Sequence, residues 1–117
     1  MKTKLLLLMS ILSLFGCGRK SAPEYPADVL TLRDGSQATL TFFKHASLAI
    51  TVGGKYIYVD PVSSYADYAS LPKADVVLIT HSHYDHLDRA AVETLLTSET
   101  EVLCDRTSAE AFEMNCY

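Results

Sequence analysis

The chain has 117 residues, 49% of them hydrophobic, and a formal net charge of −4. This length suits one small domain, and the acidic balance disfavours nucleic acid as a partner. The three cysteines lack the paired spacing of metal-binding thiolates, which excludes a structural zinc ribbon on pattern.

The amino-terminal segment has the pattern of a secretory signal. Lys2 and Lys4 precede an apolar run over residues 5–15, which is too short to span a bilayer comfortably as a mature helix. Gly16-Cys17 then resembles a bacterial lipobox. The resemblance implies cleavage before Cys17, diacylation of its thiol, and an exported lipoprotein anchored to the membrane of the bacterial cell envelope. Ordinary secretion and a retained membrane anchor are the alternatives.

These features divide the chain into three parts. Residues 1–16 are the expected signal peptide, and residues 17–28 are a lipidated tether with two prolines and little apolar content. Residues 29–117 are then the expected folded domain. Loss of the two signal-peptide lysines would make the mature chain more acidic.

The domain segment begins as a series of strands. Gly53-Gly54 predicts a tight hairpin turn, and the nearly all-apolar run 76–80 predicts a strand covered on both faces. Tyr65 and Tyr68 fall in the loop between these features, where they pack at a rim or line a substrate cleft. The predicted strands are residues 29–33, 38–43, 47–52, 55–60, 76–80 and 101–104.

Two helices complete the predicted elements. Asp88 is expected to cap a helix that continues to about Thr97, and Thr107 or Ser108 to cap the last helix. Cys104 is expected to be a small buried residue, with a Cys104–Cys116 disulfide as the alternative.

The main functional signal is the run His81-Ser82-His83-Tyr84-Asp85-His86, which follows the apolar strand directly. In extended chain, residues i and i+2 point the same way, so His81 and His83 can bind one ion together. Asp85 and His86 lie where the chain turns and could reach a second ion. Imidazole and carboxylate suit zinc, manganese or iron(II). The alternative is a polar loop whose histidines are solvent-exposed or cap the next helix.

This run is similar to the His-x-His-x-Asp-His signature of the metallo-β-lactamase fold superfamily. Upstream, Lys44-His45-Ala46-Ser47 and a hairpin ending in Asp60-Pro61 resemble the branch of lactonase-like and phosphodiesterase-like metal-dependent hydrolases. Lys44 stands where that branch usually has glycine. Over residues 38 to about 105, the resemblance implies an α/β (α+β) fold, namely the amino-terminal αβ half of a four-layer αββα sandwich.

The resemblance also implies metal ligands. It makes His81 and His83 ligands of a first metal, and Asp85 and His86 ligands of a second. Asp85 is also the implied catalytic residue, as a proton shuttle in one-metal members. Two divalent ions are therefore expected, with zinc the first expectation and manganese or iron the alternatives.

Two further residues are expected near this site. Asp60 is either a carboxylate that holds a ligating histidine or loop in place, or a turn residue before Pro61. His45 either lies near the metals, as the resemblance implies, or is a strand-end histidine with an ordinary hydrogen bond.

The expected function is hydrolysis of an ester, lactone or phosphodiester in a small-molecule or lipid-like substrate. No histidine follows His86, so the simplest expectation is the amino-terminal portion of a longer hydrolase, from a truncated reading frame, gene fragment or decayed gene. An inactive remnant or a metal-binding envelope lipoprotein is the alternative. A half sandwich would leave one apolar sheet face without its partner, so we expect the chain alone to be poorly stable.

Overall fold

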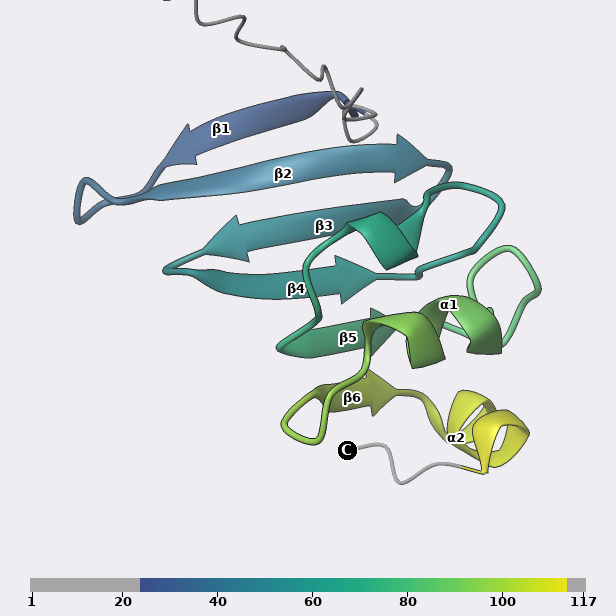
Figure 1. The fold of residues 1–117 in the computed structure, drawn as a ribbon. Coiled ribbons are helices and arrows are strands. Elements are labelled where there is room, and N and C mark those ends of the chain that lie inside the picture. The colour runs from purple at the N-terminus through teal and green to yellow at the C-terminus, as the bar shows by residue number, and fades with distance from the viewer. Residues whose placement is uncertain (1–23, 114–117) are drawn as a thin grey trace, which may run out of the picture.

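The computed structural model describes residues 24–113, which form one six-stranded sheet with two α-helices (Figure 1). The expected signal peptide, Cys17, most of the tether, Met114 and Cys116 lie outside these residues. Within residues 24–113, no helix has the length and apolar character needed to cross a membrane.

The strands lie across the sheet in chain order. The first four strands pair antiparallel with one another, and the fourth, fifth and sixth pair parallel with one another. Their bounds confirm the predicted strands closely, with the first shifted by two residues toward the amino terminus. They are β1 (Ala27–Thr31), β2 (Gln37–Lys44), β3 (Ser47–Val52), β4 (Lys55–Val59), β5 (Val76–Ile79) and β6 (Glu101–Cys104).

The helical segments are η1 (Tyr68–Ser70), α1 (Arg89–Leu95) and α2 (Arg106–Phe112). Asp88 caps α1 as predicted, because its side chain accepts from the N–H groups of Ala90 and Ala91. The predicted cap of α2 is wrong. Asp105 fills that role by accepting from the Ser108 N–H, so the helix begins earlier and Ser108 is buried inside its first turn.

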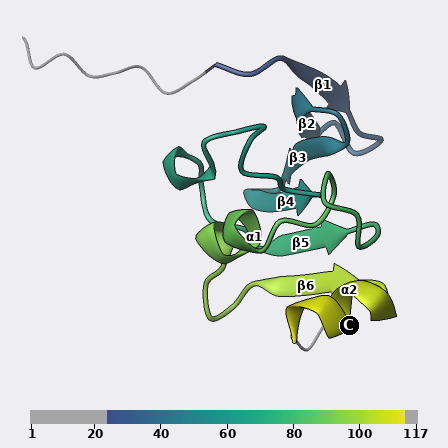
Figure 2. The ribbon, with the colours of Figure 1, turned by 90° about the vertical axis from the view of Figure 1, so that its right-hand side faces the viewer.

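The core lies between the sheet and α1. Cross-strand neighbours Tyr58, Val77 and Val102 face the same side of the sheet, beneath buried Val92 and Leu95 of α1. Figures 1 and 2 show α1 and η1 over this one face. Full burial of a Val or Leu side chain contributes about 1.5–3 kcal/mol, so this packing holds β5, and the loop that leaves it, firmly in place.

The opposite face of the sheet is less covered. Leu48, Val59, Leu78 and Leu103 form a cross-strand row there and are only half-buried, and Phe42 is 40% exposed. The prediction that residues 76–80 are covered on both faces is therefore wrong for the described part of the chain, because its α-helices bury their apolar residues on the other side. The expected low stability of the chain alone stays a prediction.

Two side chains around the core, Tyr68 and Cys104, differ from the simplest expectation, whereas Tyr65 does not. Tyr68 is buried among core residues rather than at a rim, and its hydroxyl accepts from the Val62 N–H. Tyr65 stays half-buried beside His45. Cys104 is half-buried and disulfide-bonded, not a free thiol.

Candidate metal centre

The predicted site residues meet at one end of the strands, along the side of the sheet where β2, β4 and β5 finish. Strands β2, β4 and β5 run in the same direction, so their carboxyl ends share the edge at the right of Figure 1. The β2–β3 turn supplies His45, the end of β4 supplies Asp60, and the loop after β5 supplies residues 81–86. Ligand sites of sheets with parallel strands commonly lie outside these carboxyl ends.

Asp60 is the buried anchor of this edge, with a fully inaccessible side chain. One carboxylate oxygen accepts from the Thr80 N–H at 2.7 Å. The other accepts from the Thr80 hydroxyl at 2.6 Å and from His86 Nδ1 at 2.7 Å. Its backbone has φ of 43°, a left-handed conformation that is uncommon for a residue other than glycine. Asp60 therefore fixes both the start of the β5–α1 loop and the ring of His86.

The contact with Asp60 determines which ring nitrogen of His86 can bind a metal ion. Because the carboxylate accepts at Nδ1, that nitrogen carries the ring proton. The lone pair of His86 then lies on Nε2, on the far side of the ring. Ligating histidines in metal sites are commonly held in this tautomer by a carboxylate.

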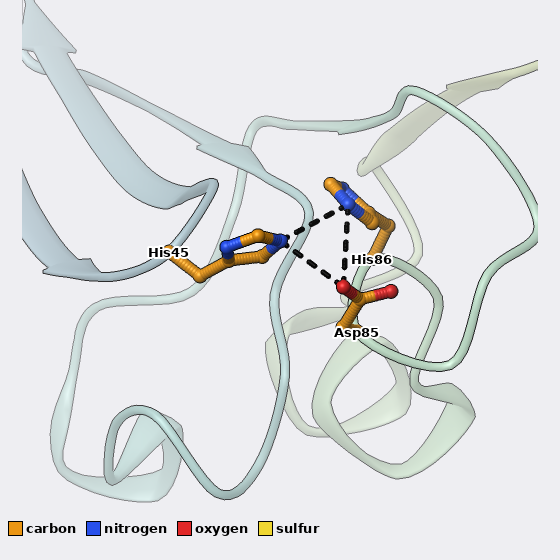
Figure 3. Close-up of side chains that lie close together, drawn as sticks. All are labelled: His45, Asp85 and His86. Carbon is orange, nitrogen blue, oxygen red and sulfur yellow. Dashed lines mark hydrogen bonds and ion pairs between the residues drawn. The ribbon is translucent and has the colours of Figure 1, made fainter.

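Three potential ligand atoms converge here, and His86 Nε2 is one of them (Figure 3). His45 Nε2 lies 3.3 Å from His86 Nε2 and 3.1 Å from Asp85 Oδ2, and the His86 and Asp85 atoms are 3.8 Å apart. Among residues 24–113, these three residues form the group whose ligand atoms all lie within 4.8 Å of one another. Two imidazoles and one carboxylate are a donor set that divalent transition metals accept.

The group is partly exposed to solvent. The side chains of His86, Asp85 and His45 are 14%, 25% and 49% exposed, respectively. Partial desolvation raises the pKa of Asp85, but its own backbone N–H and the nearby His86, His45 and His83 outweigh this and leave that pKa below its usual value. Asp85 therefore offers an anionic oxygen at neutral pH.

His81 and His83 lie beside the three-residue group rather than in it. Their ring centroids are 4.4 Å apart, and the His81 ring lies 3.9 Å from that of His86. His81 Nδ1 is 2.8 Å from the Thr80 hydroxyl oxygen. The structure thus brings both histidines to the same edge, and their role as ligands of a first metal stays a prediction.

The absence of glycine at position 44 imposes no strain there. Lys44 remains in β2, paired with Ser47, and places its ammonium 5.5 Å from the centre of the Tyr65 ring. His45 instead takes the left-handed backbone of the turn, with φ of 55°. The turn that presents His45 therefore forms with lysine before it.

Sequence reasoning missed two residues that organise the site. Thr80 donates twice to Asp60, and the buried Ser47 hydroxyl donates to the Asp60 carbonyl oxygen. Thr80 could have been noticed as the polar residue that ends an otherwise apolar strand. Nothing in the sequence around Ser47 indicates its contact.

A sequence profile of the beta-lactamase superfamily domain matches residues 39–115, which is more than half of the chain. The chain belongs to this superfamily. Its six-stranded mixed sheet with helices corresponds to half of a metallo-β-lactamase-like fold, which confirms the predicted fold class.

Several superfamily members resemble the chain. It is 38% identical over 78 residues to a UPF0173 metal-dependent hydrolase of Flavobacterium johnsoniae, covering 62% of this chain and 34% of that protein. A UPF0173 metal-dependent hydrolase of Cupriavidus necator is 30% identical over 111 residues, covering 83% of this chain and 38% of that protein.

A solved structure is also similar to this chain in sequence and fold. The crystal structure of a candidate metal-dependent hydrolase from Parabacteroides distasonis matches with a TM-score of 0.78 and 41% identity. The match covers 80% of this chain and 42% of that one. This superfamily chain therefore spans less than half the length of the relatives it matches.

Proposed function

We propose that the protein is a metal-dependent hydrolase. The observation that carries the proposal is the convergence of His86 Nε2 and Asp85 Oδ2 at the carboxyl edge of the sheet, with Asp60 holding His86 in its ligating tautomer. The names of the relatives in Flavobacterium johnsoniae and Cupriavidus necator, both metal-dependent hydrolases, support the same activity.

The donor set fits divalent metal ions, with zinc first and manganese or iron(II) as alternatives. His81 and His83 would hold one ion, and Asp85 and His86 a second. A divalent ion in such a site lowers the pKa of the water that it binds and polarises a carbonyl or phosphoryl oxygen. Asp60 keeps the lone pair of His86 pointed into the site. Asp85, anionic and partly exposed, can accept and return a proton at its carboxylate.

The substrate class that we propose is an ester, lactone or phosphodiester, in a small or lipid-like molecule. We further propose that residues 1–16 are removed and that lipidated Cys17 anchors the domain to the cell envelope through the tether. Metabolic labelling with a palmitate analogue tests the anchor. Label and membrane association should both disappear in Cys17→Ser, whereas a membrane-bound, unlabelled wild type would contradict it.

The second candidate is a metal-binding envelope lipoprotein without turnover. It is favoured by one observation: three potential ligands converge within residues 45–86. Metal binding alone would need nothing more than this group.

One experiment separates the two candidates. The full chain is loaded with zinc, manganese or iron(II) and tested on p-nitrophenyl butyrate, a simple γ-lactone and bis-p-nitrophenyl phosphate. The hydrolase proposal expects turnover that a chelator abolishes and that Asp85→Asn lowers by about 10²–10⁴-fold. Lys55→Gln, at the opposite edge of the sheet, is the matched control and should retain turnover.

Tight metal binding without turnover of any substrate class would favour the binding lipoprotein. A chain that neither binds metal nor hydrolyses these substrates would contradict both candidates.

A further inference from the structure

We propose that His45 is itself a metal ligand, and that it completes with Asp85 and His86 a three-residue metal site within residues 45–86. The proposal deepens the hydrolase proposal and rests on it, because it takes the bound ion to be the metal of that enzyme. It adds a ligand from the β2–β3 turn, 41 residues before His86.

The spacing of the three atoms suits one ion. A tetrahedral ion with ligands at about 2.0–2.1 Å holds neighbouring ligand atoms roughly 3.3 Å apart. The observed separations are 3.1 Å, 3.3 Å and 3.8 Å among His45 Nε2, His86 Nε2 and Asp85 Oδ2. The atoms therefore form a triangle close to one face of a ligand tetrahedron, as Figure 3 shows.

Hydrogen bonding alone satisfies this triangle poorly. His86 Nδ1 donates to Asp60, so in the neutral ring Nε2 is an acceptor. Asp85 Oδ2 is also an acceptor. His45 Nε2 has at most one N–H to share between these two acceptors. One cation would satisfy all three atoms at once, with neutral His45 as a ligand.

The ring of His45 is held in position by its own turn. Its left-handed backbone lies in the turn between β2 and β3, next to the Lys44–Ser47 pair. Tyr65 packs edge-on against the His45 ring, with centroids 6.3 Å apart. Ser47 also donates to the Asp60 carbonyl oxygen, so the turn that carries His45 is tied directly to the residue that orients His86.

Three protein ligands would leave one coordination position of the ion open for water or substrate. His45 is the most exposed of the three side chains, so the ion would be reached from its side. Three protein ligands with an open position are the pattern of catalytic rather than structural zinc sites.

The test is a zinc titration of the full chain by competition with a chromophoric chelator, followed by absorption spectra of the cobalt(II) form. His45→Asn is the variant of choice, because asparagine tolerates the left-handed backbone at this position. We expect at least a 10-fold loss of zinc affinity, since even residues that only orient a ligand typically cost ~10–100-fold. Lys44→Gln, at the last residue of β2 and directly before His45, should bind zinc as the wild type does.

A second variant tests directly whether the side chain at position 45 touches the bound ion. In His45→Cys, the cobalt(II) form should gain a thiolate charge-transfer band in the near ultraviolet, because the new sulfur would touch the ion. Wild-type affinity in His45→Asn, together with no such band in His45→Cys, would overturn the proposal.

The outcomes also separate this proposal from the broader one. If His45→Asn keeps its zinc while Asp85→Asn loses both zinc and turnover, His45 is not a ligand and the hydrolase proposal stands. If the wild-type chain binds neither zinc nor cobalt, the hydrolase proposal fails and this inference fails with it.

Discussion

The two ends of the β4–β5 pair each carry an aspartate that ties the strands together. At the carboxyl end, Asp60 is fully buried and accepts from Thr80 and His86. At the amino end, Asp75 accepts from the Tyr56 N–H and the Lys55 ammonium, both at 2.9 Å, with a side chain that is 35% exposed.

The two carboxylates differ in burial, and this difference shows whether joining the strands requires a buried carboxylate. Asp75 joins the strands while remaining in contact with water, so linking them does not require burial of a charge. Asp60 performs the same link with a desolvated carboxylate, a left-handed backbone and a histidine partner. Such costs are typical of functional positions, where surrounding structure holds a residue in an unfavourable state. We therefore infer that Asp60 is buried in order to orient His86, and not only to join the two strands.

The largest expected effect is that of Asp60→Ala on stability. The substitution removes the buried acceptor shared by the Thr80 N–H and His86 Nδ1. Leaving a desolvated donor without its acceptor typically costs about 1–3 kcal/mol, and both of these donors lose theirs. Urea unfolding followed by circular dichroism would measure the loss.

Asp75→Ala is the matched control for that measurement, and its effect should be much smaller because Asp75 is exposed. Equal losses for the two variants would contradict the distinction between the two ends.

The next effect is that of Asp60→Asn on metal binding. The amide keeps the size of the side chain, but an NH₂ donor in place of Oδ2 would favour a lone pair on His86 Nδ1. The ring proton would then move to Nε2 and block the ligand position. We expect a ~10–100-fold loss of zinc affinity with a smaller loss of stability than in Asp60→Ala. Unchanged affinity in a zinc titration would show that Asp60 does not control the tautomer.

Local patterns in the sequence predicted most of the fold. Alternation and turn residues identified the strands, and Ser47–Val52 has the predicted bounds. Asp88 was predicted to cap α1 because an aspartate directly precedes the periodic apolar positions. The α2 cap was missed because Asp105, Thr107 and Ser108 are all good capping residues, and only the register of the helix distinguishes them.

The candidate site was predicted only in part, for a related reason. Four of its residues are consecutive or nearly so, and their spacing alone indicated metal binding. The place of His45 depends on the β2–β3 turn lying against His86, 41 residues further along the chain, which the sequence pattern alone does not show. Its contact with Asp85 and His86 is a property of the tertiary structure.

A smaller effect is expected from Ser47→Ala. The buried Ser47 hydroxyl donates to the Asp60 carbonyl oxygen and links the β2–β3 turn to the end of β4. A typical intramolecular hydrogen bond contributes about 0.5–1.5 kcal/mol, so unfolding should become easier by that amount. If the link also positions His45, zinc affinity should fall modestly in the same variant. Thr51→Ala, in the same strand, is a control outside this contact.

The smallest effect is that of Asp75→Asn on the free energy of unfolding, and this effect depends on pH. Hydrogen bonds from the Tyr56 N–H and from Lys55 hold the pKa of Asp75 below its ordinary value of 3.8. A lowered folded-state pKa means that the stabilisation is present above pH 3.8 and is lost as pH falls through the lowered value. The small stability difference between wild type and Asp75→Asn should therefore vanish in acid. Salt should shrink it at neutral pH, because the Lys55 contact is exposed. A difference that persists unchanged below that pH would show that Asp75 acts by packing rather than by charge.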